Sequence, residues 1–91
     1  MELKGIINKL QSDGALYRCQ GILAAIKERA NDPQIIKLIQ AMKEDHVVIL
    51  GREVSAYAIA ALDILGAEKY AGEDFLIKDF IKNLPMLAQT I

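Results

Sequence analysis

The residues that could perform chemistry in this chain are few and stand apart from one another. His46 is the only histidine, and it follows Glu44 and Asp45 directly. Neighbouring side chains on a helix point about 100° apart, so these three residues cannot bind one metal ion from a helix. We therefore interpret His46 as an exposed histidine at the start of a helix, and we expect neither a metal site nor a cofactor.

The other candidate for chemistry is Cys19, the only cysteine. A lone cysteine excludes an internal disulfide and a metal site built of cysteines. A cysteine nucleophile needs a nearby base, and Cys19 instead shares an apolar helical stripe with Leu16 and Leu23, as a buried structural thiol would. Asp63, a lone charge in an apolar helix, lacks a carboxylate partner for acid–base work. The glycines are isolated and form no phosphate-binding loop. We predict that the protein is not an enzyme.

Charge and hydropathy exclude further classes. The 11 basic and 12 acidic residues are scattered and give a net charge of −1, whereas nucleic-acid binders usually carry a basic excess or stripe. The longest apolar stretch, residues 56–62, falls far short of the about 20 residues that a membrane span needs. No basic-then-apolar leader opens the chain. We expect no nucleic-acid partner, no membrane partner and a cytoplasmic location.

Amphipathic helices must position these residues. Apolar residues spaced i, i+3, i+4 and i+7 mark one face of a helix, and the pattern occurs at Leu3-Ile6-Ile7-Leu10, at Ile35-Leu38-Ile39-Met42 and at Ile77-Phe80-Ile81-Leu84. Two longer helices should lie between these three. One covers about residues 15–30, with Leu16, Cys19, Leu23 and Ile26 as its core face. The other runs from His46 or Gly51 to Leu65 and is apolar on nearly every side, so it should be central.

Helix boundaries are marked by capping residues and prolines. Asp32 and Pro33 should open the third helix, and Glu73 or Asp74 should open the last one. Pro85 should break or kink that helix and leave residues 86–91 as a short turn or a frayed tail. Brief connections make successive helices antiparallel. The sequence predicts an all-α fold, a stack of antiparallel helix pairs with about five helices and essentially no strand. It forms one domain, residues 1–91, with pairs at about 2–30 and 32–66 and a half pair at 73–91.

The helix pairs repeat one pattern. Residues 32–45, then Arg52, then Ala60-Ala61-Leu62 and the closing Gly66 resemble a HEAT repeat, which has an aspartate in the inter-helix turn and an arginine early in its second helix. The first pair carries a fainter copy with Asp13, Arg18 and Ala24-Ala25-Ile26. The resemblance implies a HEAT-like α-α superhelix. It also implies a hydrogen-bonded ladder between successive repeats, formed by Asp13, Arg18, Asp45 and Arg52.

The last helix carries an apolar stripe broader than one neighbour can cover. Because the end of a helical stack exposes one flank unless that face is polar, and contiguous apolar patches mark interaction sites, we interpret the stripe as an interaction surface. It comprises Phe75, Leu76, Ile77, Phe80, Ile81 and Leu84, extended beyond Pro85 by Leu87 and Ile91. Two copies would pair through it about a two-fold axis as a homodimer. The alternative is that the tail folds back and seals the stripe within one chain.

These expectations give two hypotheses for function. The first is a non-catalytic protein–protein interaction or scaffolding module, with a protein partner or self-association. The second, implied by the resemblance, is a HEAT-like ligand-handling protein or a lyase-type enzyme acting on a small-molecule chromophore. DNA-binding members of the family need a basic concave face, which this chain lacks. The tyrosines, Tyr17, Tyr57 and Tyr70, either cap the core with their hydroxyls in water or belong to an interface.

Overall fold

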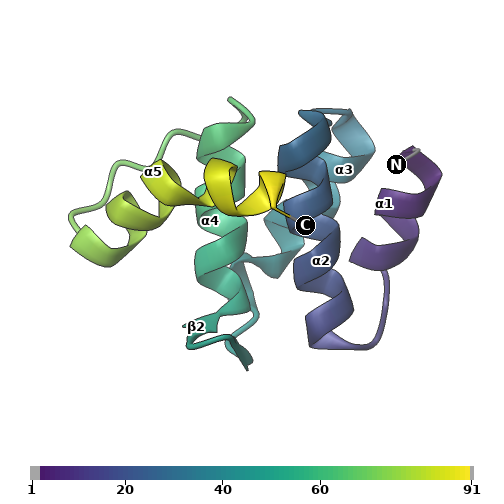
Figure 1. Ribbon diagram of the computed structural model, residues 1–91, viewed down its shortest axis with the longest axis horizontal. Coiled ribbons are helices and arrows are strands. Elements are labelled where there is room, and N and C mark those ends of the chain that lie inside the picture. The colour runs from purple at the N-terminus through teal and green to yellow at the C-terminus, as the bar shows by residue number, and fades with distance from the viewer. Residues whose placement is uncertain (1–2, 91) are drawn as a thin grey trace.

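The computed structural model describes residues 3–90, so the predicted contribution of Ile91 to the apolar stripe lies outside the described residues. Five α-helices dominate this part of the chain, which confirms the all-α class (Figure 1). In chain order the elements are α1 (Leu3–Leu10), α2 (Ala15–Glu28), α3 (Pro33–Ala41), the 3-10 helix η1 (Met42–Glu44), β1 (Val48–Ile49), β2 (Arg52–Glu53), α4 (Val54–Ile64) and α5 (Phe75–Gln89).

Local capping chemistry starts two of the helices where the sequence predicts. The Asp32 carboxylate accepts a hydrogen bond from the Gln34 backbone N–H at 2.9 Å, and Pro33 is the first residue of α3. Asp74 caps α5 by accepting from two backbone N–H groups of its first turn. Each cap satisfies amide donors that have no partner inside the helix. α2 ends at Glu28, slightly earlier than expected, because Arg29 takes the left-handed conformation with φ 52°.

The first four helices form two layers. α1 packs on α2 and α3 on α4, while α1 also contacts α3 and α2 contacts α4. α5 contacts α4 and α2, and Figure 1 shows it running across these two helices rather than alongside α3. α4 is central as predicted, with seven buried residues, and its small alanines allow neighbouring helices to approach closely. The fully buried side chains at the centre include Ile6, Ile22, Ile35, Ile39, Leu62 and Leu84.

The segment before α4 corrects one expectation. α4 begins at Val54, not at His46 or Gly51, because the preceding residues form a small antiparallel hairpin. Val48 pairs with Glu53 and Ile49 with Arg52. The two turn residues, Leu50 and Gly51, have φ values of 53° and 82°, and positive φ at both central residues is the geometry of a tight hairpin turn. The fold therefore contains a little strand where none was expected.

Of the break or kink expected at Pro85, the break is wrong. α5 continues through Pro85 to Gln89, so residues 86–89 are helical rather than a separate turn. Proline removes one backbone donor and costs the helix stability. Here the residues on either side, Leu84 and Ala88, are fully buried. Packing of these two side chains against the rest of the fold offsets the local cost and keeps the helix continuous.

Candidate protein-interaction surface

Of the four residues of the expected ladder, the structure joins two through their side chains. Arg18 Nη2 lies 2.9 Å from Asp45 Oδ2, which links the first helix pair to the second. Arg18 Nη1 also donates to the backbone carbonyls of Ser12 at 2.9 Å and Asp13 at 2.8 Å. Asp13 therefore contributes through its backbone carbonyl. Arg52 lies elsewhere, with its guanidinium over the ring of Phe80.

The Arg18–Asp45 ion pair sits in a hydrogen-bonded turn. Asp45 Oδ1 accepts from the Val47 N–H at 3.1 Å, and the Asp45 carbonyl accepts from the Ser55 N–H at 2.7 Å. Burial acts to raise the pKa of Asp45, but the Val47 hydrogen bond and the Arg18 guanidinium outweigh it and hold that pKa below its usual value. The ion pair thus fastens the loop after α1 to the turn before the hairpin.

The Cys19 thiol is a buried structural group, as the sequence predicts. Burial, together with the nearby negative charge of Asp45, raises its pKa to about 11, against a smaller opposing effect of Arg18. A thiol with this pKa is protonated at neutral pH and is a poor nucleophile. Leu16, expected on the same core stripe, is instead about half exposed in the first turn of α2.

The remaining polar candidates serve local structure. His46 is exposed, but it lies in the link before β1 rather than at a helix start, with Nδ1 2.7 Å from Glu53 Oε1. Asp63 accepts from the Tyr70 backbone N–H at 2.8 Å and so closes the link between α4 and α5. Between residues 3 and 90, no three His, Cys, Asp or Glu side chains are grouped to hold a metal ion.

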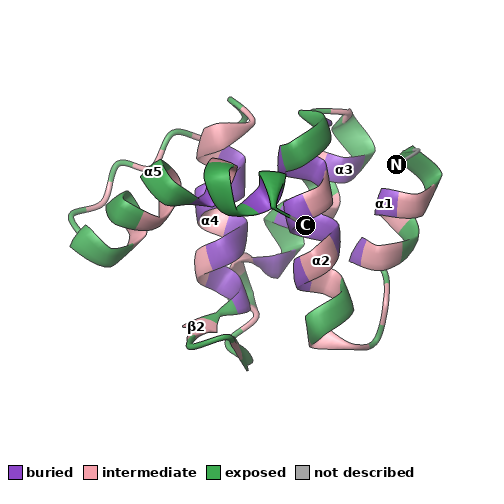
Figure 2. Cartoon of the chain, in the orientation of Figure 1, coloured by how far each residue is buried: buried purple, intermediate pink, exposed green. Residues whose placement is uncertain are grey.

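The apolar stripe of α5 is partly covered within the same chain. Leu84 is fully buried, so its assignment to an interaction surface is wrong. Ile77, Phe80 and Ile81 are partly buried, and the last two pack against the core. The physical reason is that α5 crosses α4 and α2, which cover the middle of the stripe within the same chain. Phe75 remains outside at 75% exposure, and Figure 2 shows exposed residues at the start of α5.

A groove opens between the hairpin and the first half of α5. Its volume is about 240 Å³, and its walls include Val48, Arg52, Ala56, Leu76, Ile77 and Phe80. At its floor, Phe80 meets Tyr57 edge to face, with ring centroids 4.8 Å apart and planes at 72°. The Tyr57 hydroxyl donates to the Ile49 carbonyl at 3.0 Å rather than to water, which corrects the expectation for this tyrosine. The hydroxyl contact attaches the hairpin to α4, and the ring contact attaches α4 to α5.

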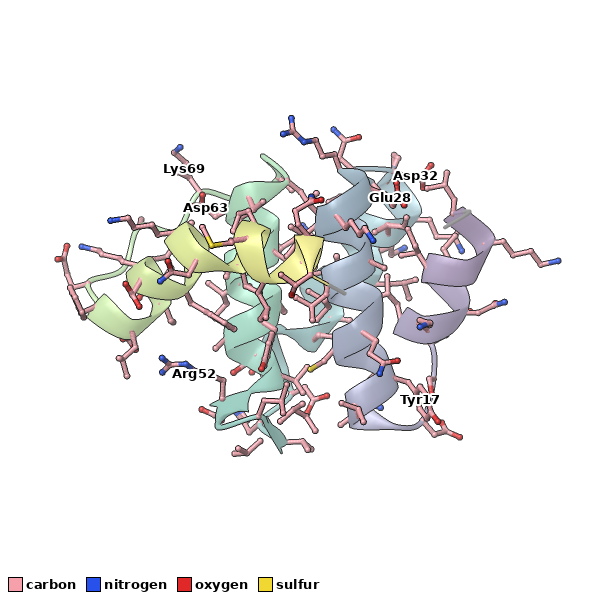
Figure 3. All side chains as sticks on the ribbon, in the orientation of Figure 1. Tyr17, Glu28, Asp32, Arg52, Asp63 and Lys69 are labelled. Carbon is pink, nitrogen blue, oxygen red and sulfur yellow. The ribbon has the colours of Figure 1, made fainter. Side chains whose placement is uncertain are left out.

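Arg52 is the cation of this groove. Its guanidinium carbon lies 5.6 Å from the centroid of the Phe80 ring, a cation–π distance. No ion pair joins it to a carboxylate among residues 3–90. Figure 3 shows the side chain at the lower edge of the molecule, between the hairpin and α5. The guanidinium therefore keeps donors for a further acceptor.

Exposed apolar side chains surround the groove. Leu50, at the tip of the hairpin, is 79% exposed, and Val48, Phe75 and Leu76 are each more than half exposed. We call these four residues, together with the groove, the hairpin–α5 surface. The sequence pattern identified Phe75 but missed Val48 and Leu50, because we assigned their segment to a helix. The signal that could have found them is the β-branched run at residues 47–49 followed by Leu-Gly.

Fold and surface define a small all-α protein with an apolar groove bordered by a strained hairpin. Compared with known proteins, the chain matches no family model, and no curated protein or solved structure is significantly similar to it. None of the helices within residues 3–90 is long and apolar enough to cross a membrane.

Proposed function

We propose that the protein is a non-catalytic interaction module that presents the hairpin–α5 surface to a protein partner or to another copy of itself. The observation that carries the proposal is the gathering of four exposed apolar side chains at one groove. Val48 and Leu76 line it, and Leu50 and Phe75 directly adjoin lining residues in the chain. Exposed apolar residues scattered singly need no explanation, but a cluster bordering a concave site is typical of binding surfaces.

The composition of the groove supports the same role. Aromatic residues and arginine are enriched in the energetically important parts of protein interfaces, and here Phe75, Phe80 and Arg52 lie on or beside one groove. The Tyr57–Phe80 contact holds the floor in place, so a partner would meet a preorganised surface. This groove is smaller than the about 300–1,000 Å³ of typical small-molecule sites. Two other pockets reach that range, at about 430 and 610 Å³, but neither gathers the exposed large apolar side chains of the hairpin–α5 surface. We therefore favour the interaction role over the handling of a chromophore.

We extend the proposal to the repeat architecture. In it, α1–α4 are two HEAT-like helix pairs, and α5 covers one layer of the stack. Its support is the pairing of α1 with α3 and of α2 with α4, together with the Arg18–Asp45 link between the pairs. We also place the module in the cytoplasm, because a sequence with a single cysteine makes no use of intramolecular disulfides.

Matched charge substitutions test the interaction role. Phe75 and Met86 are both 75% exposed and both lie on α5, but only Phe75 has direct chain neighbours, Asp74 and Leu76, that line the groove. Wild type, Phe75→Glu and Met86→Glu would each be cross-linked in source cells and affinity-purified, and any complex found would be rebuilt from purified components. We expect a complex, with itself or with another protein, that Phe75→Glu loses and Met86→Glu retains. No complex with wild type, or equal complexes with both variants, would refute the proposal. Circular dichroism checks that each variant is folded.

A further inference from the structure

We infer that the groove is filled by the hairpin tip of a second copy of this chain, so that two copies exchange Leu50 across a two-fold axis. The inference rests on the proposed function, to which it adds the identity of the partner and the geometry of contact. It also replaces the pairing through the middle of α5 that the sequence suggests, since Leu84 is buried there.

The first observation is the conformation of Leu50. Its φ of 53° lies in the left-handed region, where asparagine or glycine suits a tight hairpin turn and leucine is disfavoured. The same side chain is the most exposed large apolar residue within residues 3–90, at 79%. A residue that is unfavourable both for its backbone and for its contact with water points to a use outside the single chain.

The second observation is a groove of suitable size. Truncating a buried leucine leaves a cavity of about 150 Å³ in a well-packed protein, and the groove offers about 240 Å³. One leucine side chain therefore fits, with room for part of a neighbouring residue. Ala56, Ile77 and Phe80 give the groove apolar walls that match a leucine.

Leu50 also adjoins the groove. Gly51, which follows Leu50 in the turn, is itself part of the groove wall. A two-fold contact uses the same patch on both partners, so the patch must carry both the inserted residue and its receptor. Because Leu50 adjoins the groove, each hairpin can enter the other copy's groove in one symmetric contact.

The charges around the groove are complementary to the incoming hairpin. Arg52 directly follows the turn and has no carboxylate partner between residues 3 and 90. Two carboxylates, Glu53 and Asp74, line the groove. Glu53 faces His46, whereas Asp74 uses Oδ1 to cap α5 and keeps Oδ2 free of any hydrogen bond to the described residues. Arg52 itself lines the groove beside these carboxylates, so a two-fold contact would bring Arg52 of each copy to Asp74 of the other.

The apolar area available agrees with a small dimer interface. Four large side chains that are each more than half exposed supply roughly 300–400 Å² of apolar surface per copy. A standard interface buries about 800 Å² per partner, of which a little over half is apolar, or about 450 Å². The hairpin–α5 surface approaches this area, as the small interface of a transient dimer would.

Analytical ultracentrifugation of the full chain from about 1 to 300 μM tests the inference. We expect a reversible monomer–dimer equilibrium. In Leu50→Asn, the new residue suits the left-handed turn but lacks the apolar side chain that would enter the groove. This variant should therefore raise the dimer dissociation constant at least tenfold. Met86→Asn removes an equally large exposed side chain away from the groove and should leave the constant within twofold.

A second variant probes the groove itself. Ala56→Leu places a larger side chain in the groove wall and should weaken dimerisation as Leu50→Asn does, while circular dichroism reports whether each variant is folded. A monomeric wild type over this range overturns the inference, as does a dimer that Leu50→Asn leaves unchanged. In either case, a different protein that binds wild type but does not bind the Phe75→Glu variant would still support the proposed function. The inference and the proposed function can therefore fail separately.

Discussion

The Arg18 side chain connects two parts of the fold that are distant in sequence, and its removal should be costly. One guanidinium nitrogen donates to the Ser12 and Asp13 carbonyls, and the other pairs with Asp45. Replacing Arg18 with Met keeps much of the aliphatic stem but removes all three hydrogen bonds. The loop after α1 and the turn before the hairpin are then no longer joined by the Arg18 side chain.

The expected magnitude follows from the exposure of these groups. The Arg18 and Asp45 side chains are 20% and 19% exposed, so the pair is only partly shielded from water and is worth about 1 kcal/mol. Two further hydrogen bonds to carbonyls that water partly reaches add about 0.5–1 kcal/mol each. Arg18→Met should therefore lower the free energy of unfolding by about 2–3 kcal/mol. For a domain of this size, that corresponds to a fall in Tm of about 10–20 °C.

Urea denaturation and calorimetry measure both quantities. Lys37→Met is the control, because Lys37 is an exposed cation on α3 and its loss should change stability by no more than about 0.5 kcal/mol. In a double-mutant cycle, Arg18→Met and Asp45→Asn should couple by about 1 kcal/mol, since each removes the same ion pair. An Arg18→Met variant as stable as Lys37→Met, or a cycle without coupling, would refute this account of the link between the helix pairs.

Three further predictions concern the buried core, the loss of stability at acid pH and the Cys19 thiol. Ala60→Asp should unfold the protein in circular dichroism, because Ala60 is fully buried and an unpaired carboxylate there costs several kcal/mol out of a total of about 5–15; a folded variant with wild-type Tm would contradict the central position of α4. The pKa of Asp45 is lower in the folded chain than its ordinary 3.8. Its contribution to the free energy of unfolding is therefore complete above that value and is lost as the pH falls through the folded pKa. Urea midpoints measured from pH 6 to pH 2 should fall less steeply for Asp45→Asn than for wild type. With a pKa of about 11 and a buried position, Cys19 should react with a thiol reagent at pH 7 only as fast as the protein opens, and rapid labelling of the native protein would count against its burial.

Much of the helical framework could be predicted from local pattern. The i, i+3, i+4, i+7 spacing located α1, α3 and α5, and Asp32-Pro33 fixed the start of α3 because capping depends on residues adjacent in sequence. The hairpin was missed for a related reason. Its strands have two residues each, too short for a period-two pattern, and its turn has leucine where the usual signal is asparagine.

The candidate site was predicted only in part. The helical spacing of apolar residues in α5 correctly grouped Ile77, Phe80 and Leu84 on one face of the helix. It could not indicate which elements that face contacts. Leu84 is buried and Phe75 exposed because α5 crosses α2 and α4 over its later turns and leaves its first turn outside. Likewise, Arg52 was assigned to a ladder from its place in the repeat, whereas the hairpin carries it to Phe80.

The sequence by itself determined where most helices lie, that α4 is central, and that Cys19 is a buried thiol, because periodicity, capping and helix propensity act over one or two turns of chain. Only the tertiary structure decided which part of the apolar stripe on α5 stays exposed. It also decided that Leu50, with its strained left-handed backbone, belongs to the same surface as that part. Those outcomes depend on the angle at which α5 crosses its neighbours and on Tyr57, whose ring packs on Phe80 and whose hydroxyl binds the hairpin at the Ile49 carbonyl. Contacts between residues far apart in the chain set both, and no local pattern encodes them.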